Sequence, residues 1–141
     1  MTAHYIGTKE ILGYESMKDG RYGYTVRYED GYESWSPKAT FEATYRVIEG
    51  PNQALTFGDA VHLLKRGKKV ARAGWNGKGM FLFLVPGSTF KVNRAPLMGI
   101  YPEGTEVSYC PHIDMKTADG KVVPWLASQT DVLAEDWTSV D

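Results

Sequence analysis

Short apolar or alternating runs separated by turn signals recur along the chain and predict a sheet-rich fold. The first three runs are residues 10–17, 22–28 and 31–35, separated by Lys-Asp-Gly and by Glu-Asp-Gly. Such tripeptides are typical of hairpin turns. In the second run, tyrosine and valine alternate with polar or small residues, so one face of that strand is mostly tyrosine. We therefore expect a three-stranded sheet at the start of the chain.

A short helix is expected directly after this sheet. Ser36 is placed to cap it, Pro37 suits its first position, and Phe41 and Tyr45 fall on its inner face. A three-stranded sheet closed by one helix is near the minimum that folds, since ~45 residues bury little surface. We interpret its aromatic residues as the core of this small unit. A partner-binding cage, as in Tudor-like or chromo-like modules, is the alternative.

The sequence Glu-Gly-Pro-Asn-Gln at residues 49–53 interrupts the pattern, because Gly-Pro ends both helices and strands. We place a domain boundary there and predict two domains, residues 1–50 and residues 51–141.

The main helix of the second domain is expected to begin after Thr56. Thr56 and Asp59 form a capping-box-like start, and the apolar residues that follow have helical spacing. Gly67 ends the predicted helix. The fold class is therefore α+β, with a small antiparallel sheet and one main helix in the second domain.

The middle of the chain joins a charged strand to a continuous apolar strand through a glycine-rich turn. Residues 69–72 and 80–85 are the predicted strands, and GWNGKG at residues 74–79 lies between them. Three glycines let the backbone approach another group closely, and they place Trp75 and Asn76 at the tip. A plain hairpin needs only Asn-Gly, so we interpret the turn as a ligand-binding loop. The alternative is that Trp75 folds back over the sheet edge.

Two prolines and two glycines between residues 95 and 105 predict a structured loop. Asn93 and Arg94 precede it directly. Their amide and guanidinium groups suit a base edge or a phosphate, although both side chains are equally able to bond within the loop.

Residues 106–115 are expected to form one strand, and residues 121–125 return after an Ala-Asp-Gly turn. Alternation places Cys110, His112 and Asp114 on one face, which offers a nucleophile, a base and an acid. However, side chains two apart on a strand lie roughly 6 to 7 Å apart, too far for the hydrogen bonds of a catalytic triad. We therefore assign no catalytic residue, and the spacing fits no familiar zinc site.

A second aromatic and polar cluster lies near the end of the chain. Trp125 offers a stacking face, and Ser128, Gln129 and Asp131 bring hydroxyl, amide and carboxylate groups that can contact a ribose or a base edge. The alternative is that these polar residues form a turn and a helix cap. A final strand is expected around residues 137–140.

Composition narrows the choice of function. The 141 residues are 43% hydrophobic and 23% charged, as in ordinary globular proteins, with no apolar run near the ~18 residues of a membrane span and no signal-peptide pattern. One cysteine excludes an intramolecular disulfide, and a net charge of -1 disfavours duplex nucleic acid as a partner. Aromatic residues reach 13%, and their flat faces suit nucleobases.

Three long motifs appear in order: KKVARAGWNGKGMFLFLVPGSTFKVNR, LMGIYPEGTEVSYCPHIDMKTADG and VPWLASQTDVLAEDW. Together they resemble the second type of phage Thoeris anti-defence family, over residues 55–140. The resemblance does not reach residues 1–50, which look like a small phage module of unknown role.

The resemblance implies a sponge rather than an enzyme. Members of this family sequester, uncleaved, the cyclic ADP-ribose isomer by which the bacterial Thoeris system signals infection, and some also bind cyclic oligonucleotides at a separate site. They assemble as tetramers with the ligand pocket between subunits. For this chain the resemblance implies a homodimer or homotetramer with no cofactor. Because the sequence shows neither a membrane span nor a signal-peptide pattern, we expect it to act in the host bacterial cytoplasm, with no membrane partner.

The resemblance and the residue chemistry together give a candidate ligand site. Tryptophans supply stacking faces, a methionine completes the apolar wall, arginines face phosphate charge, and the remaining side chains make polar contacts. The alternatives are an enzyme that cleaves cyclic nucleotides with His112 and Asp114 as acid and base, and an adaptor that acts through residues 1–50. The candidate ligand-binding residues are Arg72, Trp75, Asn76, Met80, Asn93, Arg94, Trp125, Ser128, Gln129 and Asp131.

Overall fold

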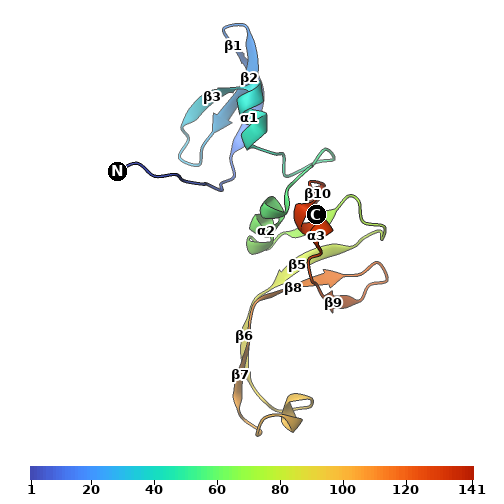
Figure 1. Ribbon diagram of the computed structural model, residues 1–141. Helices are drawn as coiled ribbons and strands as arrows, with labels where there is room; N and C mark the ends of the chain where they lie inside the picture. Colours follow the sequence, from blue (N-terminus) through green and yellow to red (C-terminus); the bar gives the residue numbers. More distant parts are fainter. The chain divides into compact units, whose positions relative to one another are not determined.

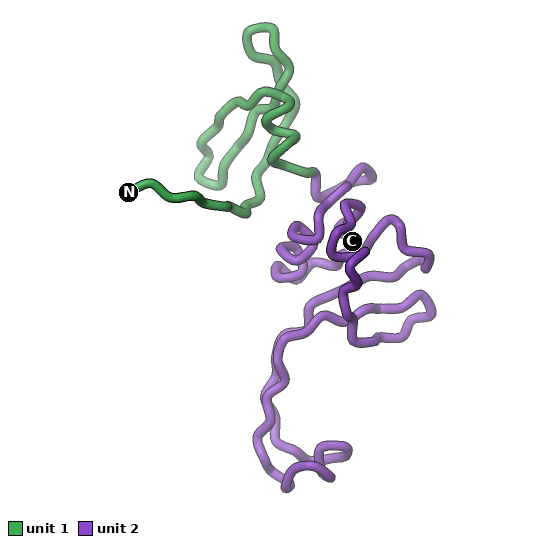
Figure 2. The backbone as a smooth tube through the Cα atoms, in the orientation of Figure 1, with its two compact units in different colours: residues 1–46 green, residues 47–141 purple.

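The computed structural model describes residues 1–141 and confirms the α+β class, with helices and several antiparallel sheets (Figure 1). Its backbone divides into two compact units, unit 1 (residues 1–46) and unit 2 (residues 47–141), coloured separately in Figure 2. No helix is both long and apolar enough to cross a membrane.

Unit 1 is a three-stranded antiparallel sheet followed by a short helix. Strands β1 (Leu12–Lys18), β2 (Arg21–Arg27) and β3 (Glu33–Pro37) pair in that order, so both predicted hairpins are confirmed. Helix α1 (Lys38–Thr44) begins one residue later than expected. Ser36 belongs to β3 and makes no capping bond, so its predicted cap is wrong.

The core of unit 1 lies between the sheet and α1. Phe41 of the helix stacks on Tyr24 of β2 at 4.0 Å between ring centroids, and Tyr45 packs beside Phe41 at 5.0 Å. Val26 is the one fully buried hydrophobic residue of the unit. These aromatic residues therefore serve as core, and the opposite face of the sheet has no helix over it.

Unit 2 is built on a five-stranded antiparallel sheet with the order β10-β4-β5-β8-β9. The last strand of the chain lies at one edge, beside the first strand of the unit. The strands are β4 (Lys69–Arg72), β5 (Phe81–Val85), β8 (His112–Lys116), β9 (Val122–Pro124) and β10 (Trp137–Val140).

Helix α2 (Phe57–Lys65) packs on this sheet and begins as the sequence predicts. Thr56 Oγ1 accepts a hydrogen bond from the Asp59 N–H, and the Asp59 carboxylate accepts one from the Thr56 N–H. Gly67, with a φ of 81°, reverses the chain after the helix. Apolar residues of the helix and sheet form one core, whose fully buried members are Leu55, Ala60, Leu63, Leu64, Val70, Leu82 and Trp137.

A two-stranded ribbon, which we call the arm (residues 88–109), projects from the five-stranded sheet (Figure 1). Strands β6 (Ser88–Lys91) and β7 (Glu106–Tyr109) form it, and the 3-10 helix η1 (Leu97–Gly99) lies at its end. The single strand predicted for residues 106–115 is wrong. Cys110 and Pro111 interrupt it, because proline lacks the N–H that a continuous ladder requires, and the two halves join different sheets.

Candidate functional site

The centre of unit 2 is an aromatic group, which we call the Trp137 cluster and define as Phe57, Trp75, Trp125 and Trp137. Trp137 is fully buried, and its ring lies 5.5 Å from those of Phe57 and Trp75 and 6.1 Å from that of Trp125. Its Nε1 donates to the backbone oxygen of Asp131 at 3.0 Å. Neither Trp137 nor Phe57 was among the candidate ligand-binding residues predicted from the sequence.

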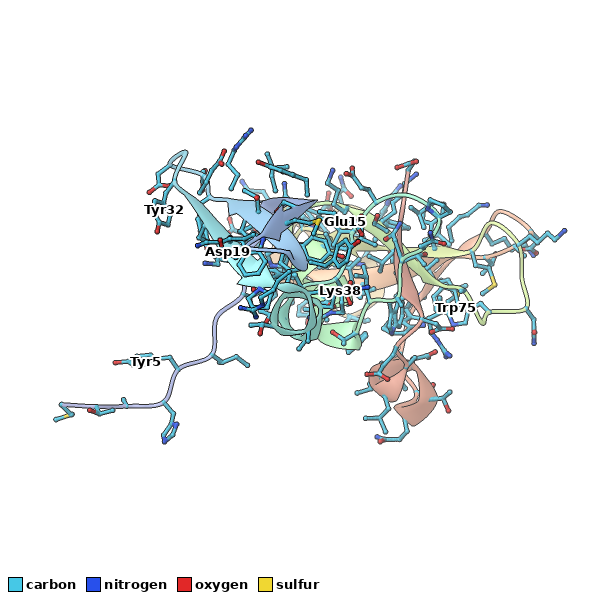
Figure 3. The ribbon with its side chains drawn as sticks, turned by 90° about the horizontal axis from the view of Figure 1, so that it is seen from above. Tyr5, Glu15, Asp19, Tyr32, Lys38 and Trp75 are labelled. Carbon is cyan, nitrogen blue, oxygen red and sulfur yellow. The ribbon has the colours of Figure 1, made fainter.

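The two tryptophans predicted to stack on a ligand both pack against Trp137. Trp75 meets it at 78° between ring planes and Trp125 at 88°, so each contact is edge to face. Trp75 also donates from Nε1 to Asp131 Oδ1 at 3.3 Å. Trp75, which is labelled in Figure 3, therefore packs on the core of unit 2, and only the exposed part of its ring remains for a ligand.

Arg72, at the end of β4, is held by two carboxylates. Its Nη1 lies 2.9 Å from Asp131 Oδ1 and its Nε lies 2.9 Å from Asp136 Oδ1. Asp136 also accepts a bond from the Gly74 N–H at 2.8 Å, which fixes the start of the glycine-rich loop. Because two carboxylates bind the Arg72 guanidinium, it positions the loop and Asp131. Fewer of its N–H groups remain for a phosphate.

The charges in this arrangement shift one another's pKa values. Bonds from Arg72 lower the pKa of Asp136. Burial by itself would raise the pKa of Asp131, but bonds from Arg72, Ser128 and Trp75 more than offset it and lower the pKa. The two carboxylates in turn raise the pKa of Arg72. All three groups therefore stay charged at neutral pH.

Ser128 and Asp131 form the start of the short helix α3 (Gln129–Leu133). Ser128 Oγ accepts from the Asp131 N–H at 3.0 Å, and Asp131 Oδ2 accepts from the Ser128 N–H at 3.2 Å. This is the helix cap that the alternative interpretation of the sequence predicts. Gln129 follows at the first helical position and is exposed.

The other two candidate residues of the glycine-rich loop, Asn76 and Met80, differ in burial. Asn76 is exposed at the loop tip, whereas Met80 is half-buried and covers Gly77. A Cβ atom at Gly77 would overlap the Met80 sulfur, so the loop closes on this side chain only because residue 77 is glycine. Lys116 donates to the Gly79 carbonyl at 3.1 Å and ties the loop to β8.

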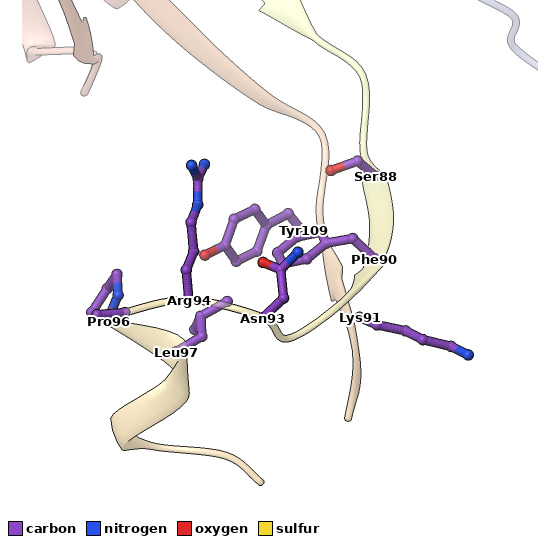
Figure 4. A pocket seen from close by; sticks show the side chains of 9 residues that line it. Ser88, Phe90, Lys91, Asn93, Arg94, Pro96, Leu97 and Tyr109 are labelled. Carbon is purple, nitrogen blue, oxygen red and sulfur yellow. The ribbon is translucent and has the colours of Figure 1, made fainter. Parts of the chain in front are cut away.

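Asn93 and Arg94 lie apart from the other candidates, on the arm. They line a cavity of about 680 Å³ between the two strands and η1 (Figure 4). The structure thus separates the ten candidates into eight near the Trp137 cluster and the glycine-rich loop, and two on the arm. The cavity is lined by Ser88, Phe90, Lys91, Asn93, Arg94, Ala95, Pro96, Leu97 and Tyr109.

His112 and Asp114 are closer than the spacing along a strand led us to expect. His112 Nε2 lies 3.4 Å from Asp114 Oδ2, and His112 Nδ1 lies 3.2 Å from the Cys110 carbonyl oxygen. The argument that residues two apart cannot touch is wrong here, because both side chains lean toward each other. Cys110 is exposed and contributes only its backbone. No group of three or more His, Cys, Asp or Glu residues is arranged to hold a metal ion.

Comparison with known proteins assigns unit 2 to a family. Residues 55–140 match the family model described as the Thoeris anti-defense 2-like domain. The chain is also similar to a protein of Bacillus phage SP01 named Thoeris anti-defense 2, with 45% identity over 86 residues, which are 61% of this chain and 94% of the relative. All ten candidate residues fall inside the family match, and residues 1–54 lie outside it.

Proposed function

We propose, from the premise that this chain belongs to the Thoeris anti-defense 2-like family, that unit 2 binds a cyclic ADP-ribose-type immune signal and sequesters it uncleaved. Sequestration would block Thoeris-type immunity in the cytoplasm of the host bacterium. The observation that carries the proposal is the family match, because it spans the whole Trp137 cluster and the arm.

The chemistry near the Trp137 cluster suits binding without turnover. Half-exposed indoles offer faces to an adenine base, and each such stack is worth ~1 to 3 kcal/mol. Asn76 and Gln129 are exposed amides that can contact a ribose or a base edge. Asp131, with its depressed pKa and several donors, is an acceptor rather than a proton donor at neutral pH.

The arm candidates favour a site shared between two copies of the chain. Asn93 and Arg94 are exposed and follow β6 on the arm, whereas Trp75 and Trp125 pack against Trp137 beside the five-stranded sheet. An arm that reaches the Trp137 cluster of a second copy would bring cation and aromatic groups to the same ligand. We therefore propose a homodimer or homotetramer, and light scattering that found a monomer with tight ligand binding would contradict it.

The fate of the ligand tests the proposal. The full chain is incubated with the cyclic ADP-ribose isomer, denatured by heat, and the supernatant is separated by chromatography. A sponge returns intact cyclic ligand in an amount no greater than its number of sites. Linear product in excess of the protein would overturn sequestration.

A cleaving enzyme is the second candidate, because the 3.4 Å contact between His112 and Asp114 pairs an imidazole with an orienting carboxylate. The substitution His112→Ala separates the two functions. In the sponge the released ligand is chemically the same with and without His112, whereas in the enzyme product formation stops.

The sequence also leaves open an adaptor that acts through unit 1. Calorimetric titration with the cyclic ADP-ribose isomer and with cyclic oligonucleotides distinguishes it. The absence of any binding would favour the adaptor, and binding of both ligands at once would indicate two separate sites in unit 2.

A further inference from the structure

Unit 1 has a second sheet face that its core does not use. The side chains that point away from α1 come from alternate positions of the three strands, as the strand register and the contact of Phe41 with Gly13 establish. We call them the outer face of unit 1. Its residues are Leu12, Tyr14, Ser16, Lys18, Arg21, Gly23, Thr25, Arg27, Glu33, Trp35 and Pro37.

An indole ring lies flat on this outer face. Trp35 of β3 crosses Gly23 of β2, where a Cβ atom would lie only 2.5 Å from Trp35 Cζ2. Glycine at this position therefore lets the ring lie against the strand. The buried Nε1 of Trp35 has no hydrogen-bond partner, so this polar atom does not stabilise the position of the ring. The indole is half-buried and interacts with its neighbours through its aromatic ring.

Two cations lie over the indole ring. The Arg21 guanidinium carbon lies 5.6 Å and Lys18 Nζ 5.9 Å from the Trp35 ring centroid, and both residues are exposed. The hydroxyls of Ser16 and Thr25 meet at 2.8 Å on the same face, and Tyr14 beyond them is 51% exposed. Arg27 lies at the far end of β2, about six residues or roughly 20 Å from Arg21. Its Nε and Nη2 bond to Glu33 Oε1, which leaves its Nη1 for a phosphate.

The charge of unit 1 is separated between its two faces. Residues 1–46 contain six Lys and Arg against seven Asp and Glu, which gives a net charge of -1. The outer face holds three of the cations and one carboxylate, Glu33, so it is positive by two charges. Of the other carboxylates, Glu15 lies on the opposite face and Glu42 on α1, whereas Asp19 lies in the turn between Lys18 and Arg21. The partner that complements this face is therefore an anion with flat apolar groups.

We propose that the outer face of unit 1 binds single-stranded nucleic acid, with Trp35 and Tyr14 stacking on bases and Lys18, Arg21 and Arg27 contacting phosphates. Rows of cations with aromatic rings between them are the usual means of holding a single strand without reading its sequence. The length of β2 corresponds to a few nucleotides. This function belongs to residues outside the family match and does not depend on the ligand of unit 2.

The experiment measures binding of the full chain to fluorescein-labelled oligothymidylate by anisotropy, over a range of salt concentrations. Neutralising two to three phosphates predicts a slope of log K against log salt of about -1.4 to -2.1. A slope near zero, or no binding at low salt, would overturn the proposal.

Matched variants locate the site. Lys18→Gln with Arg21→Gln should weaken binding roughly ten- to thirtyfold and reduce the salt slope. Lys9→Gln with Lys38→Gln removes two charges from unit 1 outside the outer face and should leave binding unchanged; Lys38 is seen at the start of α1 in Figure 3. Equal losses in both double variants would overturn the proposal.

Stacking is tested separately from charge. Trp35→Leu should weaken binding about tenfold with the salt slope unchanged, because a base stack involves no counterion. If this variant unfolds unit 1, the double variant Lys18→Gln with Arg21→Gln still tests the proposal, because both of these side chains are exposed and their replacement leaves the core unchanged. Competition by polyglutamate as effective as that by unlabelled oligothymidylate would show that the face takes any acidic chain, and would overturn the assignment to nucleic acid.

Discussion

Units 1 and 2 are both antiparallel sheets with a helix on one face, yet each uses its central tryptophan differently. Trp137 of unit 2 is fully buried, contacts three aromatic rings and has its N–H satisfied. Trp35 of unit 1 lies on the face that no helix covers, and its N–H has no partner. One tryptophan stabilises a core, and the other belongs to the face that we propose as a binding surface.

The two units also contain Arg–carboxylate pairs with the same separation. Arg27 and Glu33 lie 2.9 Å apart with side chains 50% and 43% exposed, whereas Arg72 and Asp131 lie 2.9 Å apart at 15% and 13%. Distance alone does not distinguish them. Burial distinguishes their contributions to stability. Water and salt screen an exposed pair, so it contributes ~1 kcal/mol or less.

The largest expected effect comes from Trp137. Trp137→Ala removes the centre of the core and should lower the free energy of unfolding of unit 2 by about 3 to 5 kcal/mol. Trp35→Ala leaves no enclosed cavity and should cost unit 1 less than half as much. Urea unfolding followed by circular dichroism measures both losses, and equal losses would break the comparison between the two tryptophans.

Arg72→Gln should have the next largest effect. It leaves two carboxylates of unit 2 without their cation, and we expect a loss of about 2 to 3 kcal/mol, below that of a fully buried pair because Asp136 is partly exposed. The measurement is again urea unfolding. A variant as stable as the parent would show that the clamp around Asp131 contributes nothing to the fold.

The same clamp predicts how unit 2 responds to acid. The pKa values of Asp131 and Asp136 are lowered in the folded state, so their stabilisation is complete above the unfolded value of about 3.9. It is lost as the pH falls through their folded values. Unfolding curves recorded on both sides of that range should show the loss in the parent and a weaker one in Arg72→Gln. If the stability of the parent and of Arg72→Gln fell with pH in the same way, other carboxylates would be responsible for the acid sensitivity.

Trp75→Ala should weaken binding of the cyclic ADP-ribose isomer by roughly ten- to a hundredfold, equivalent to ~1 to 3 kcal/mol. Because Trp75 also contacts Trp137 and donates to Asp131, the variant loses some stability as well. Calorimetry is therefore done where unfolding shows the variant to be folded. Trp75→Phe keeps an aromatic face and serves as the control. An unchanged affinity for Trp75→Ala would exclude the loop from the site.

The smallest effect is expected for Glu33→Gln in unit 1. Removing the carboxylate of an exposed pair should change the free energy of unfolding by less than about 1 kcal/mol, and high salt should abolish even that difference. A loss as large as that of Arg72→Gln would show that exposure does not set the strength of these pairs.

Interactions could be predicted from the sequence where the interacting residues are close together in the chain. The capping box of Thr56 and Asp59 and the hairpins of unit 1 depend on residues three to fifteen positions apart, and they form as predicted. Pro111 also indicates a break within residues 106–115, because proline has no N–H to donate to a neighbouring strand. The alternating pattern of these residues nevertheless led us to predict one strand.

Contacts between distant segments were not predictable from one sequence. Arg72 bonds to Asp136, 64 residues away, because β10 pairs with β4, and no local pattern specifies that pairing. Trp137 was predicted only as part of a strand, although it is the centre of the cluster that organises Trp75 and Trp125. The position of Asn93 and Arg94 on a separate arm likewise depends on how β6 and β7 leave the sheet.

The place of β10 beside β4 also sets an order of events during protein synthesis. Unit 1 precedes unit 2 in the chain and therefore leaves the ribosome before it. All strand pairs of unit 1 are local, so it can fold while unit 2 is still being translated. Unit 2 lacks Trp137, the partner of Leu55, until its final strand has been made. Until then β4 has an open edge, and chaperone binding to the nascent chain should concentrate on that strand.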